Sequence, residues 1–407
     1  HAIEHNLSIK QKEAARNQSE VELNTAQWSR MPNLNGNIGQ SFNFGRALQA
    51  DNTYGNRNTR NTNFSLGTNI PPFTGMQIPN SIALSKLNLK AATEDLAKAK
   101  EDISIQVASY FLQVLFNEEL TKIARNQVAL SQEQLDRKIA FFRNGKASEA
   151  EVLEAKSRLA QDQLSLVQAE NNHQLALLDL SQLLELPSPE GFQINVPDID
   201  NFSVHLTLPE EVYAQAMMNK PAIKAAQYRL QGAEKSIKIA QSGYYPQLSF
   251  GAGIGTNYYH LSGIENAPFS TQWDQNMNKY LQFSLSIPIF NRFQTRNRVK
   301  SARIQHTALS WQLEESKKAL YKEIQQAYYN ALAAESKYKS SQSANESAEA
   351  SFRLMSEKYA NGKASATEYN EMRTAWMKAL SDGVQAKYEF VYRSKILDFY
   401  KGVPLTL

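Results

Sequence analysis

Four segments of the chain, within residues 33–44, 59–70, 247–258 and 281–287, alternate between apolar and polar residues. A period of two predicts β-strands that present one apolar and one polar face. The apolar positions carry no Lys, Arg, Asp or Glu. They are Leu34, Ile38, Phe42, Phe64, Leu66, Leu248, Phe250, Ile254, Leu281, Phe283, Leu285 and Ile287.

The opposite face of these strands is polar but nearly free of charge. It is built from Asn, Ser, Gln and Gly, for example Asn35, Asn37 and Ser284. Strands of roughly ten residues with an apolar and an uncharged polar face are typical of a membrane β-barrel, with lipid on the apolar side. Two surface hairpins that pack one face on helices would show the same alternation, so the strands alone leave both interpretations open.

Two stretches, residues 80–142 and 292–360, contain no proline and hardly a turn signal, which predicts very long helices. Apolar residues recur there, and in the residues that follow, at spacings of three and four, the pattern of a coiled-coil seam. We expect each helix to turn at an Asn-Gly pair and fold back on itself, because Gly145 and Gly362 can adopt the positive φ that such a turn needs.

The plan of the chain occurs twice. Residues 144–148, Asn-Gly-Lys-Ala-Ser, recur letter for letter at 361–365, and scattered matches in one order indicate a duplicated unit. We expect a first repeat over residues 1–186, a linker over 187–209 and a second repeat over 210–407. Each repeat contains a helix (1–30, 210–243), a β-hairpin (32–72, 246–290) and a coiled-coil hairpin (79–186 with its tip at 142–148, 292–402 with its tip at 359–365).

Four strands are too few for a closed membrane barrel, which needs about eight or more. An open sheet edge cannot face lipid, because its backbone groups would lack hydrogen-bond partners there. If the strands cross a membrane, several copies of the chain must therefore pool them. Two copies would supply eight strands and three would supply twelve, and the long helices would then continue away from the membrane as a helical tube.

Several motifs occur in the same order in both halves. They are Pro32 and Pro246 before the strands, residues 70–75 and 287–292 between strand and helix, and the hairpin tips at 142–153 and 359–369. On these motifs the chain resembles, over essentially its whole length, the TolC-like outer-membrane efflux proteins. The resemblance implies a mainly α fold with a membrane β-barrel portion: a homotrimer with a 12-stranded β-barrel continued by an α-helical barrel.

The resemblance also implies a place and a function. The protein is expected in the outer membrane of a Gram-negative bacterium, in contact with its lipid and extending into the periplasm, with the inter-repeat linker as an equatorial belt. Its partners would be a periplasmic adaptor protein and an inner-membrane pump or exporter. It would act as the exit duct of a tripartite efflux or type I secretion system. The alternative is a coiled-coil structural or interaction protein without a channel.

Composition excludes other classes. A net charge of +4 over 407 residues gives no basic footprint for nucleic acid. The absence of Cys excludes disulfides, thiol catalysis and cysteine zinc sites. No nucleophile–base pair, phosphate loop or ligand cluster is visible, so we expect no enzyme activity, no catalytic or metal-binding residues and no cofactor. The chain begins at His1 without a signal peptide, as expected of a mature or trimmed product.

The hairpin tips carry the candidate functional residues. In proteins of this type, acidic residues at the start of the returning helix can ring a periplasmic gate; here these are Glu151, Glu154, Glu368 and Glu371. The Ser-x-x-Glu pattern at Glu151 and Glu368 also matches a helix capping box, which we favour, and a solvated helix face would explain Glu154 and Glu371.

The same tips are the expected adaptor-docking surface. Its residues are Asn144, Gly145, Lys146, Asn361, Gly362 and Lys363. Ala364 stands where these proteins can carry a basic residue that locks the gate. Lys363 and Lys146 are the candidates to replace it, and the sequence leaves the locking contact open.

Overall fold

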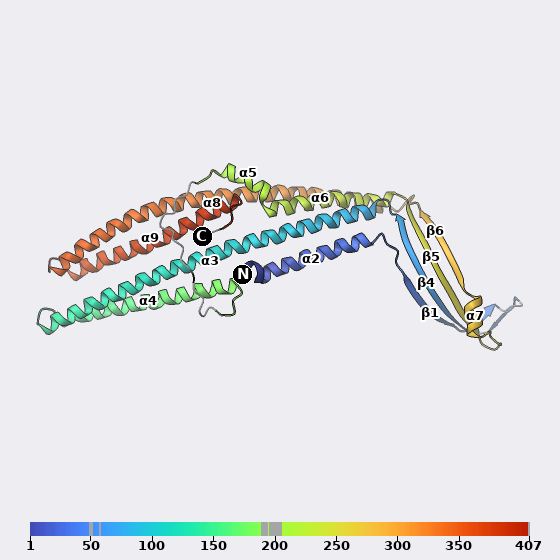
Figure 1. Cartoon of the computed structure of the whole chain (residues 1–407), viewed down its shortest axis with the longest axis horizontal. Helices are drawn as coiled ribbons and strands as arrows, with labels where there is room; N and C mark the ends of the chain where they lie inside the picture. The colour runs from blue at the N-terminus through green and yellow to red at the C-terminus, as the bar shows by residue number, and fades with distance from the viewer. Residues whose placement is uncertain (49–51, 57, 189–193, 195–205, 406–407) are drawn as a thin grey trace. The chain divides into compact units, whose positions relative to one another are not determined.

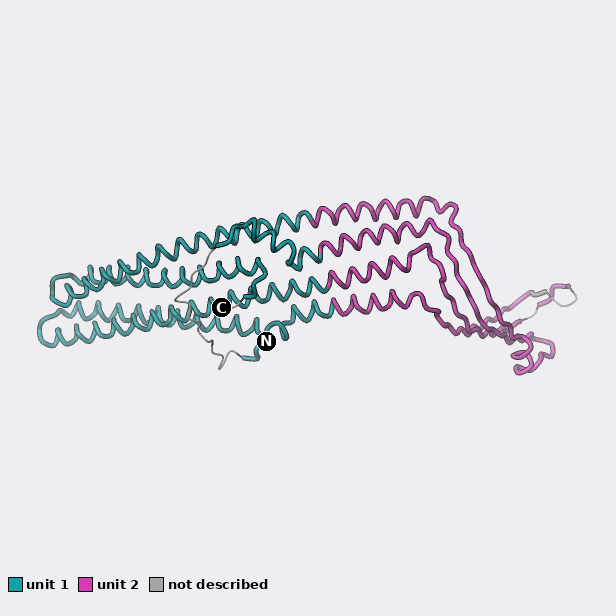
Figure 2. Tube along the Cα trace, turned by 45° about the horizontal axis from the view of Figure 1, so that its top comes forward, with its two compact units in different colours: residues 1–15, 93–225, 314–407 teal, residues 16–92, 226–313 magenta. Residues whose placement is uncertain are grey.

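We describe the protein from a computed structural model, which places residues 1–48, 52–56, 58–188, 194 and 206–405. The chain forms two compact units, shown in different colours in Figure 2. Unit 1 contains residues 1–15, 93–225 and 314–407, and unit 2 contains residues 16–92 and 226–313. Each unit draws segments from both halves of the chain. Most of the expected linker, 187–209, lies outside the described residues.

Four long helices form two antiparallel hairpins. Helix α3 (Gln77–Arg143) returns as α4 (Glu149–Leu183), and α8 (Gln294–Ala360) returns as α9 (Ala366–Tyr400). Figure 1 shows α4 alongside α3 and α9 alongside α8. The outgoing helices are 67 residues long and the returning ones 35 in both hairpins. None of the described helices is apolar over a stretch long enough to span a bilayer.

The shorter helices are each interrupted once where the sequence predicted a continuous helix. Helices α1 (Ala2–His5) and α2 (Leu7–Trp28) are separated by Asn6, which has extended backbone angles. Helices α5 (Pro209–Asn219) and α6 (Pro221–Gln241) are separated by Lys220, which is extended because it precedes a proline. A single 3₁₀ turn, Ser242–Tyr244, follows α6.

The core of unit 1 consists of narrow apolar clusters between helices rather than one large core. One cluster joins Ala2 and Ile9 to Ile103, and another joins Leu112 and Leu115 to Tyr388. Leu159 and Leu180, both on the coiled-coil seam expected from the sequence, are buried at 8% and 1% exposure. The predicted seam therefore does face the partner helix, as the spacing of three and four requires. The spacing of three and four in this part of the sequence runs through Leu159, Leu166, Leu177, Leu180 and Leu184, of which Leu184 caps the end of α4.

Unit 2 carries a four-stranded antiparallel sheet in the order β1-β4-β5-β6 (Figure 1). The strands are β1 (Asn35–Asn43), β4 (Thr59–Phe73), β5 (Gln247–Leu261) and β6 (Asn278–Ser286). A small ribbon of β2 (Arg46–Leu48) and β3 (Tyr54–Asn56) lies in the loop between β1 and β4. The two hairpins thus join through their second and first strands, β4 and β5. Within the described residues, β1 and β6 each keep one edge without a partner strand.

The register places the predicted apolar residues on one face of this sheet. Residues directly opposite each other in an antiparallel pair share a face. Ile38 is paired with Phe64, Leu66 with Ile254, and Phe250 with Phe283, and the rings of this last pair lie 4.8 Å apart.

The other face is polar or small. Asn35 is paired with Gly67, which is paired with Gly253, which is paired with Tyr280. The ring of Tyr280 lies over Gly253, where an added Cβ would come within 2.6 Å of Cε1 of the ring. The glycines therefore make room for this tyrosine on the uncharged face.

A short helix, α7 (Phe269–Gln275), lies in the long segment between β5 and β6, where the sequence predicted only a loop. It packs on the apolar face: the ring of Trp273 lies 5.1 Å from that of Phe64, and Phe269 packs edge-on against the same ring at 6.2 Å. Phe64, expected to be exposed, is therefore half-buried. Phe269 and Trp273 are one helical turn apart, so the helix places both rings on the same side, against the sheet.

Candidate functional site

The two hairpin tips have nearly identical backbone turns. Gly145 has φ +71° and Gly362 has φ +72°, the left-handed conformation expected of a glycine just after a helix end. Lys146 N–H donates to the carbonyl of Phe141 at 2.8 Å, and Lys363 N–H makes the equivalent bond at 2.8 Å. The sequence prediction that glycine turns each hairpin is confirmed.

The six docking candidates lie at these turns, where their side chains are exposed. The side chains of Asn144 and Asn361 donate to the carbonyls of Ala140 and Glu357, at 2.8 and 2.9 Å. Each side chain thereby adds a hydrogen bond to a carbonyl in the last turn of its outgoing helix, and the Glu357 carbonyl also accepts from Asn361 N–H at 3.2 Å. The two tips therefore present well-defined, solvent-accessible turns.

Capping boxes start both returning helices, as the sequence predicted. Glu151 N–H donates to Ser148 Oγ at 3.3 Å, and Ser148 N–H donates back to Glu151 Oε1 at 3.3 Å. Ser365 and Glu368 make the same pair of bonds at 3.2 and 2.8 Å. The bond from Ser365 N–H holds the pKa of Glu368 below its usual value, because it stabilises the carboxylate.

Glu151 has a second partner, Lys138, on the facing helix α3. This hydrogen bond, together with that from Ser148 N–H, lowers the pKa of Glu151. Burial alone would lower the pKa of Lys138, but its hydrogen bonds to Glu151 and Tyr359 outweigh this and raise it. The ammonium also lies 5.4 Å from the ring centre of Tyr359 on α8, so it links both hairpins near the tip.

An ion pair between Arg373 on α9 and Asp162 on α4 joins the two hairpins deeper in unit 1. Arg373 Nη2 donates to Asp162 Oδ2 at 2.8 Å, and the side chains are only 2% and 3% exposed. The same nitrogen donates to Ser131 Oγ at 2.8 Å and to the carbonyl of Gln127 at 2.9 Å, both on α3. Three helices from both hairpins therefore meet at one guanidinium.

Asp162 is satisfied from several directions. Gln127 Nε2 donates to its Oδ1 at 2.8 Å, Ser131 donates to Oδ2, and Arg158 Nε lies 3.6 Å from Oδ1. A buried charge is tolerated only when it is paired and hydrogen-bonded in this way.

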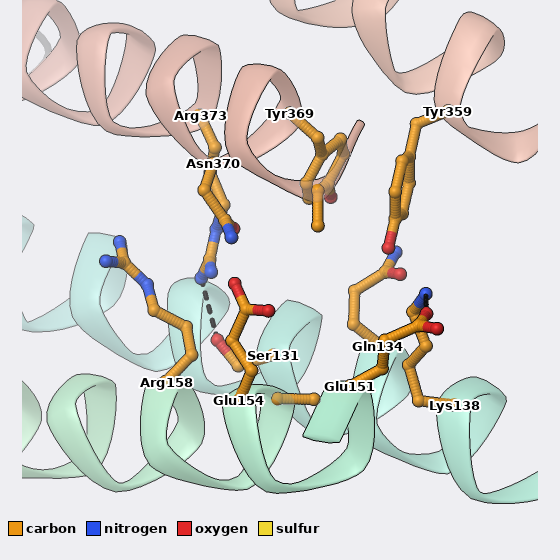
Figure 3. A pocket seen from close by; sticks show the side chains of 12 residues that line it. Ser131, Gln134, Lys138, Glu151, Glu154, Arg158, Tyr359, Tyr369, Asn370 and Arg373 are labelled. Atoms are coloured by element: carbon orange, nitrogen blue, oxygen red, sulfur yellow. Dashed lines mark hydrogen bonds and ion pairs between the residues drawn. The ribbon is translucent and has the colours of Figure 1, made fainter. Parts of the chain in front are cut away.

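A small cavity of about 50 Å³ lies between this ion pair and the tips. Figure 3 shows side chains from α3, α4, α8 and α9 converging on it, among them Glu154, Arg158, Tyr359 and Tyr369. Gln134 Oε1, Arg158 Nε, Tyr369 Oη and Arg373 Nε are buried and form no hydrogen bond to a described residue. A cavity with such a lining suits water rather than an apolar ligand. The hairpins therefore contact each other here mainly through polar side chains.

The four acidic gate candidates are therefore not equivalent. Glu151 and Glu368 are held in capping boxes, Glu154 lines the cavity, and Glu371 is exposed on α9. Arg373 and Asp162 were missed from the sequence, since each looks like an ordinary charged residue of a helix. One signal for Arg373 was available: it lies on the same side of the helix as Tyr369, one turn before it, and Met377, one turn after it. Both of these residues are buried, so this spacing places Arg373 on the buried side as well.

The apolar face of the sheet is the second candidate site. Most of its predicted residues are exposed, from 42% for Leu66 to 76% for Leu281, and Leu248 and Phe250 are half-buried by neighbours on the sheet. Monomeric soluble proteins rarely expose contiguous apolar surface of this extent. The structure thus defines a class: paired helical hairpins attached to a sheet with one broad apolar face.

Comparison with known proteins identifies that class. The sequence pattern of the family described as "Outer membrane efflux protein" matches residues 1–185 and 212–402. The chain belongs to this family, whose members are proteins of the bacterial outer membrane. A solved structure of CusC superimposes with a TM-score of 0.83 at 16% identity, covering 98% of this chain and 90% of that one, so the fold is shared.

Two relatives illustrate the extent of the sequence similarity. Outer membrane protein TolC of Escherichia coli (strain K12) is 23% identical over 297 residues, 72% of this chain and 59% of that protein. The pyoverdine export outer membrane protein OpmQ of Pseudomonas putida is 25% identical over 237 residues, 58% of this chain and 47% of that protein. The matched part of this chain spans less than two thirds of either relative.

Proposed function

We propose that the protein is a homotrimeric exit duct in the outer membrane, passing substrates from a periplasmic adaptor and an inner-membrane pump or exporter to the exterior. The observation that carries this proposal is the sheet. One of its faces is apolar and largely uncharged, the other is polar and uncharged, and both of its edges are open within the described residues. On β5, Leu248 to Thr256 extend about 27 Å at a rise of about 3.4 Å per residue, which matches an apolar band about 25 Å tall.

The open edges call for further copies of the chain. Strand edges in lipid must be paired, because no water is present to bond their N–H and C=O groups. Four strands per chain become a closed barrel of 12 when three copies join β6 of one to β1 of the next. In that arrangement the uncharged polar face, with Asn35 and Ser284, would line the lumen.

Helix α4 supports the same assembly. Leu164, Val167, Leu175 and Leu178 are exposed by 71%, 62%, 50% and 36% and lie on one side of the helix, opposite the buried Asp162. This second apolar stripe faces away from the hairpin partner α3. A helix with apolar stripes on two sides is expected in a tube wall, where it packs against a neighbour on each flank.

We propose that the hairpin tips dock the adaptor through Asn144, Gly145, Lys146, Asn361, Gly362 and Lys363, and that the tips also close the duct. Glu154 and Glu371 are the better gate candidates, since Glu151 and Glu368 are engaged as caps. The duct carries out no catalysis. Residues 1–186 and 210–407 are then the two duplicated halves, joined by the linker at 187–209.

The test is the mass of the detergent-extracted protein, measured by light scattering and by electrophoresis with and without heating. We expect a species of three times 45.9 kDa that falls to the monomer on heating. A water-soluble monomer or dimer would refute the duct and favour a coiled-coil interaction protein.

A further inference from the structure

A groove of about 430 Å³ runs along the apolar face of the sheet beside α7. Its floor is formed by Ile38, Phe64, Leu66 and Ile254, and Trp273 and Met277 stand over it. None of the described residues that line it is charged. The groove is continuous with the exposed apolar band, because Leu66 and Ile254 also line the next hollow toward Leu281.

Hydrogen bonds to β5 hold helix α7 over the sheet, so one wall of the groove is part of the fold. Strand β6 pairs with β5 only as far as Gly255. Beyond Gly255, the side chain of Gln272 pairs with the β5 backbone as a neighbouring strand would. Its Oε1 accepts from Tyr259 N–H at 2.8 Å, and its Nε2 donates to the Tyr259 carbonyl at 3.0 Å. Asn276 donates to the Asn257 carbonyl at 2.7 Å.

The buried hydroxyl of Thr256, beneath the helix, is also satisfied. Thr256 Oγ1 donates to the carbonyl of Trp273 at 2.9 Å. Asn37 and Ser65 are the other polar residues in the described lining, so the groove offers its occupant mainly apolar contacts, and a charged ligand would find no charged partner there to replace its hydration.

The position of the groove along the strands indicates the occupant. Toward the loops, the same face continues with Thr62 and Tyr258, then with Arg60 and His260, and Arg60 is exposed. Phe42 shares the row of Arg60, and Lys279, paired with Ile254, is a further cation at the edge strand β6. On the central strands β4 and β5 the face therefore changes from apolar to polar and cationic within two rows of residues, as expected near a membrane surface. Trp and Tyr concentrate at that depth, and the groove lies just on the apolar side of it.

We propose that this groove binds one acyl chain of a membrane lipid, clamped between Trp273 and the sheet at the loop end of the apolar band. This inference rests on the proposed function, since it needs the apolar face to lie in the bilayer. It goes further in assigning a discrete lipid site to one protomer, because the described residues that line the adjoining hollow toward Leu281 are strand residues and Leu34, next to β1, with no helix among them to hold a chain.

The test is fluorescence quenching in phosphatidylcholine vesicles whose acyl chains carry bromine near the carboxyl end. Trp28, Trp311 and Trp376 are replaced by Phe, which leaves Trp273 as the only tryptophan. A second protein has Trp273→Phe as well and Phe283→Trp, on the open apolar face. Both are first checked for the heat-sensitive oligomer. We expect both to lose fluorescence relative to vesicles without bromine.

A groove-filling variant separates the site from bulk lipid. Gly36 lines the groove, and a Cβ there would meet only Leu66 Cδ1 at 3.8 Å, so Gly36→Leu fills space without a backbone clash. It should abolish most of the quenching of Trp273 and leave the quenching of the tryptophan introduced by Phe283→Trp unchanged. Gly39→Leu, on the polar face with nothing within 4 Å of its Cβ, is the matched control and should change neither.

The outcomes distinguish the two proposals. The lipid site is overturned, and the duct is not, if the tryptophan at position 283 is quenched and Trp273 is not. The same conclusion follows if both are quenched and Gly36→Leu does not reduce the quenching of Trp273. If a second copy of the chain fills the groove, we likewise expect no quenching of Trp273, because the brominated lipid is kept out. Absence of quenching at both positions, in protein that is incorporated in the vesicles, refutes the membrane face and the lipid site together.

Discussion

Arg373 and Asp162 are charged residues placed where a coiled coil normally has apolar ones. Removing two charges from water is costly, and their attraction offsets the cost only when every remaining hydrogen-bonding group is also satisfied. Here Ser131 and Gln127 supply most of those bonds. We expect the pair to contribute specificity, by fixing which turn of α9 faces which turn of α3 and α4.

Replacement of Arg373 by Met should destabilise the contact between the hairpins by about 3 kcal/mol, because Asp162 would remain buried without its cation. Hydrogen exchange of residues 127–131 and 158–162 should accelerate accordingly. The double variant Arg373→Met/Asp162→Leu should recover most of the protection, since it leaves no unpaired charge. Equal exchange rates in the Met variant and the parent would show that the ion pair does not hold the hairpins together.

The sequence predicted side-chain hydrogen bonds correctly where the two bonded residues are close in the chain. The capping boxes of Ser148 with Glu151 and of Ser365 with Glu368 were readable because their residues are three positions apart. The bond from Arg373 to Asp162 spans 211 positions, so only the packing of two hairpins, which no local pattern specifies, brings the two side chains together.

At the scale of elements, the starts of α4 and α9 should respond to acid. Both Glu151 and Glu368 have a pKa lowered from 4.5 in the folded protein. Their contribution to stability is therefore fully present above about pH 4.5 and is lost as the pH falls through the lower, folded values.

Hydrogen exchange of residues 148–152 and 365–369, measured from neutral to acidic pH and corrected for intrinsic rates, should show protection falling only below about pH 4.5. In Glu151→Gln and Glu368→Gln variants the caps no longer titrate, so this step should disappear. A step of the same size in both variants would assign the acid response to other groups.

The faces of the sheet should differ in their tolerance of charge. Phe283→Arg places a cation in the middle of the apolar face and should cost about 2–4 kcal/mol in a bilayer, with a corresponding loss of the heat-sensitive oligomer on gels. Ser284→Arg, one residue along on the polar face, should leave assembly intact and alter ion permeation in planar bilayers. Equal effects of both substitutions on assembly would contradict the assignment of the faces.

The alternation of residues specified which side chains share a face of the sheet, and the register agrees for every predicted strand. The alternation did not predict the lengths of the two central strands. Strands β4 and β5 extend to 15 residues each, past the point where the period of two fades, because they pair with each other at the centre of the sheet. Helix α7 was also missed, since seven residues are too few for a helical period to be distinguished from a loop.

For the whole molecule, the exposed stripe of α4 provides a direct test of assembly. Leu164→Glu with Leu175→Glu should weaken the association of copies, because each carboxylate would have to be buried at the interface without a partner. Ser165→Glu, on an exposed flank of the same helix, is the control and should leave the oligomer unchanged. Light scattering in detergent measures both, and a stable oligomer in the double variant would place α4 away from the interface.

The pairing of β4 with β5 has a consequence for biogenesis. Thr59 is paired with Leu261, so the centre of the sheet closes only after nearly two thirds of the chain has been synthesised. The β1–β4 hairpin needs only local contacts and can form early. Until β5 is available, the edge of β4 is unpaired and the apolar face is exposed, a state prone to misassociation. Contacts so distant in sequence also form slowly. The interval between the first hairpin and the arrival of the second half is therefore the stage of biogenesis at which we expect misassociation.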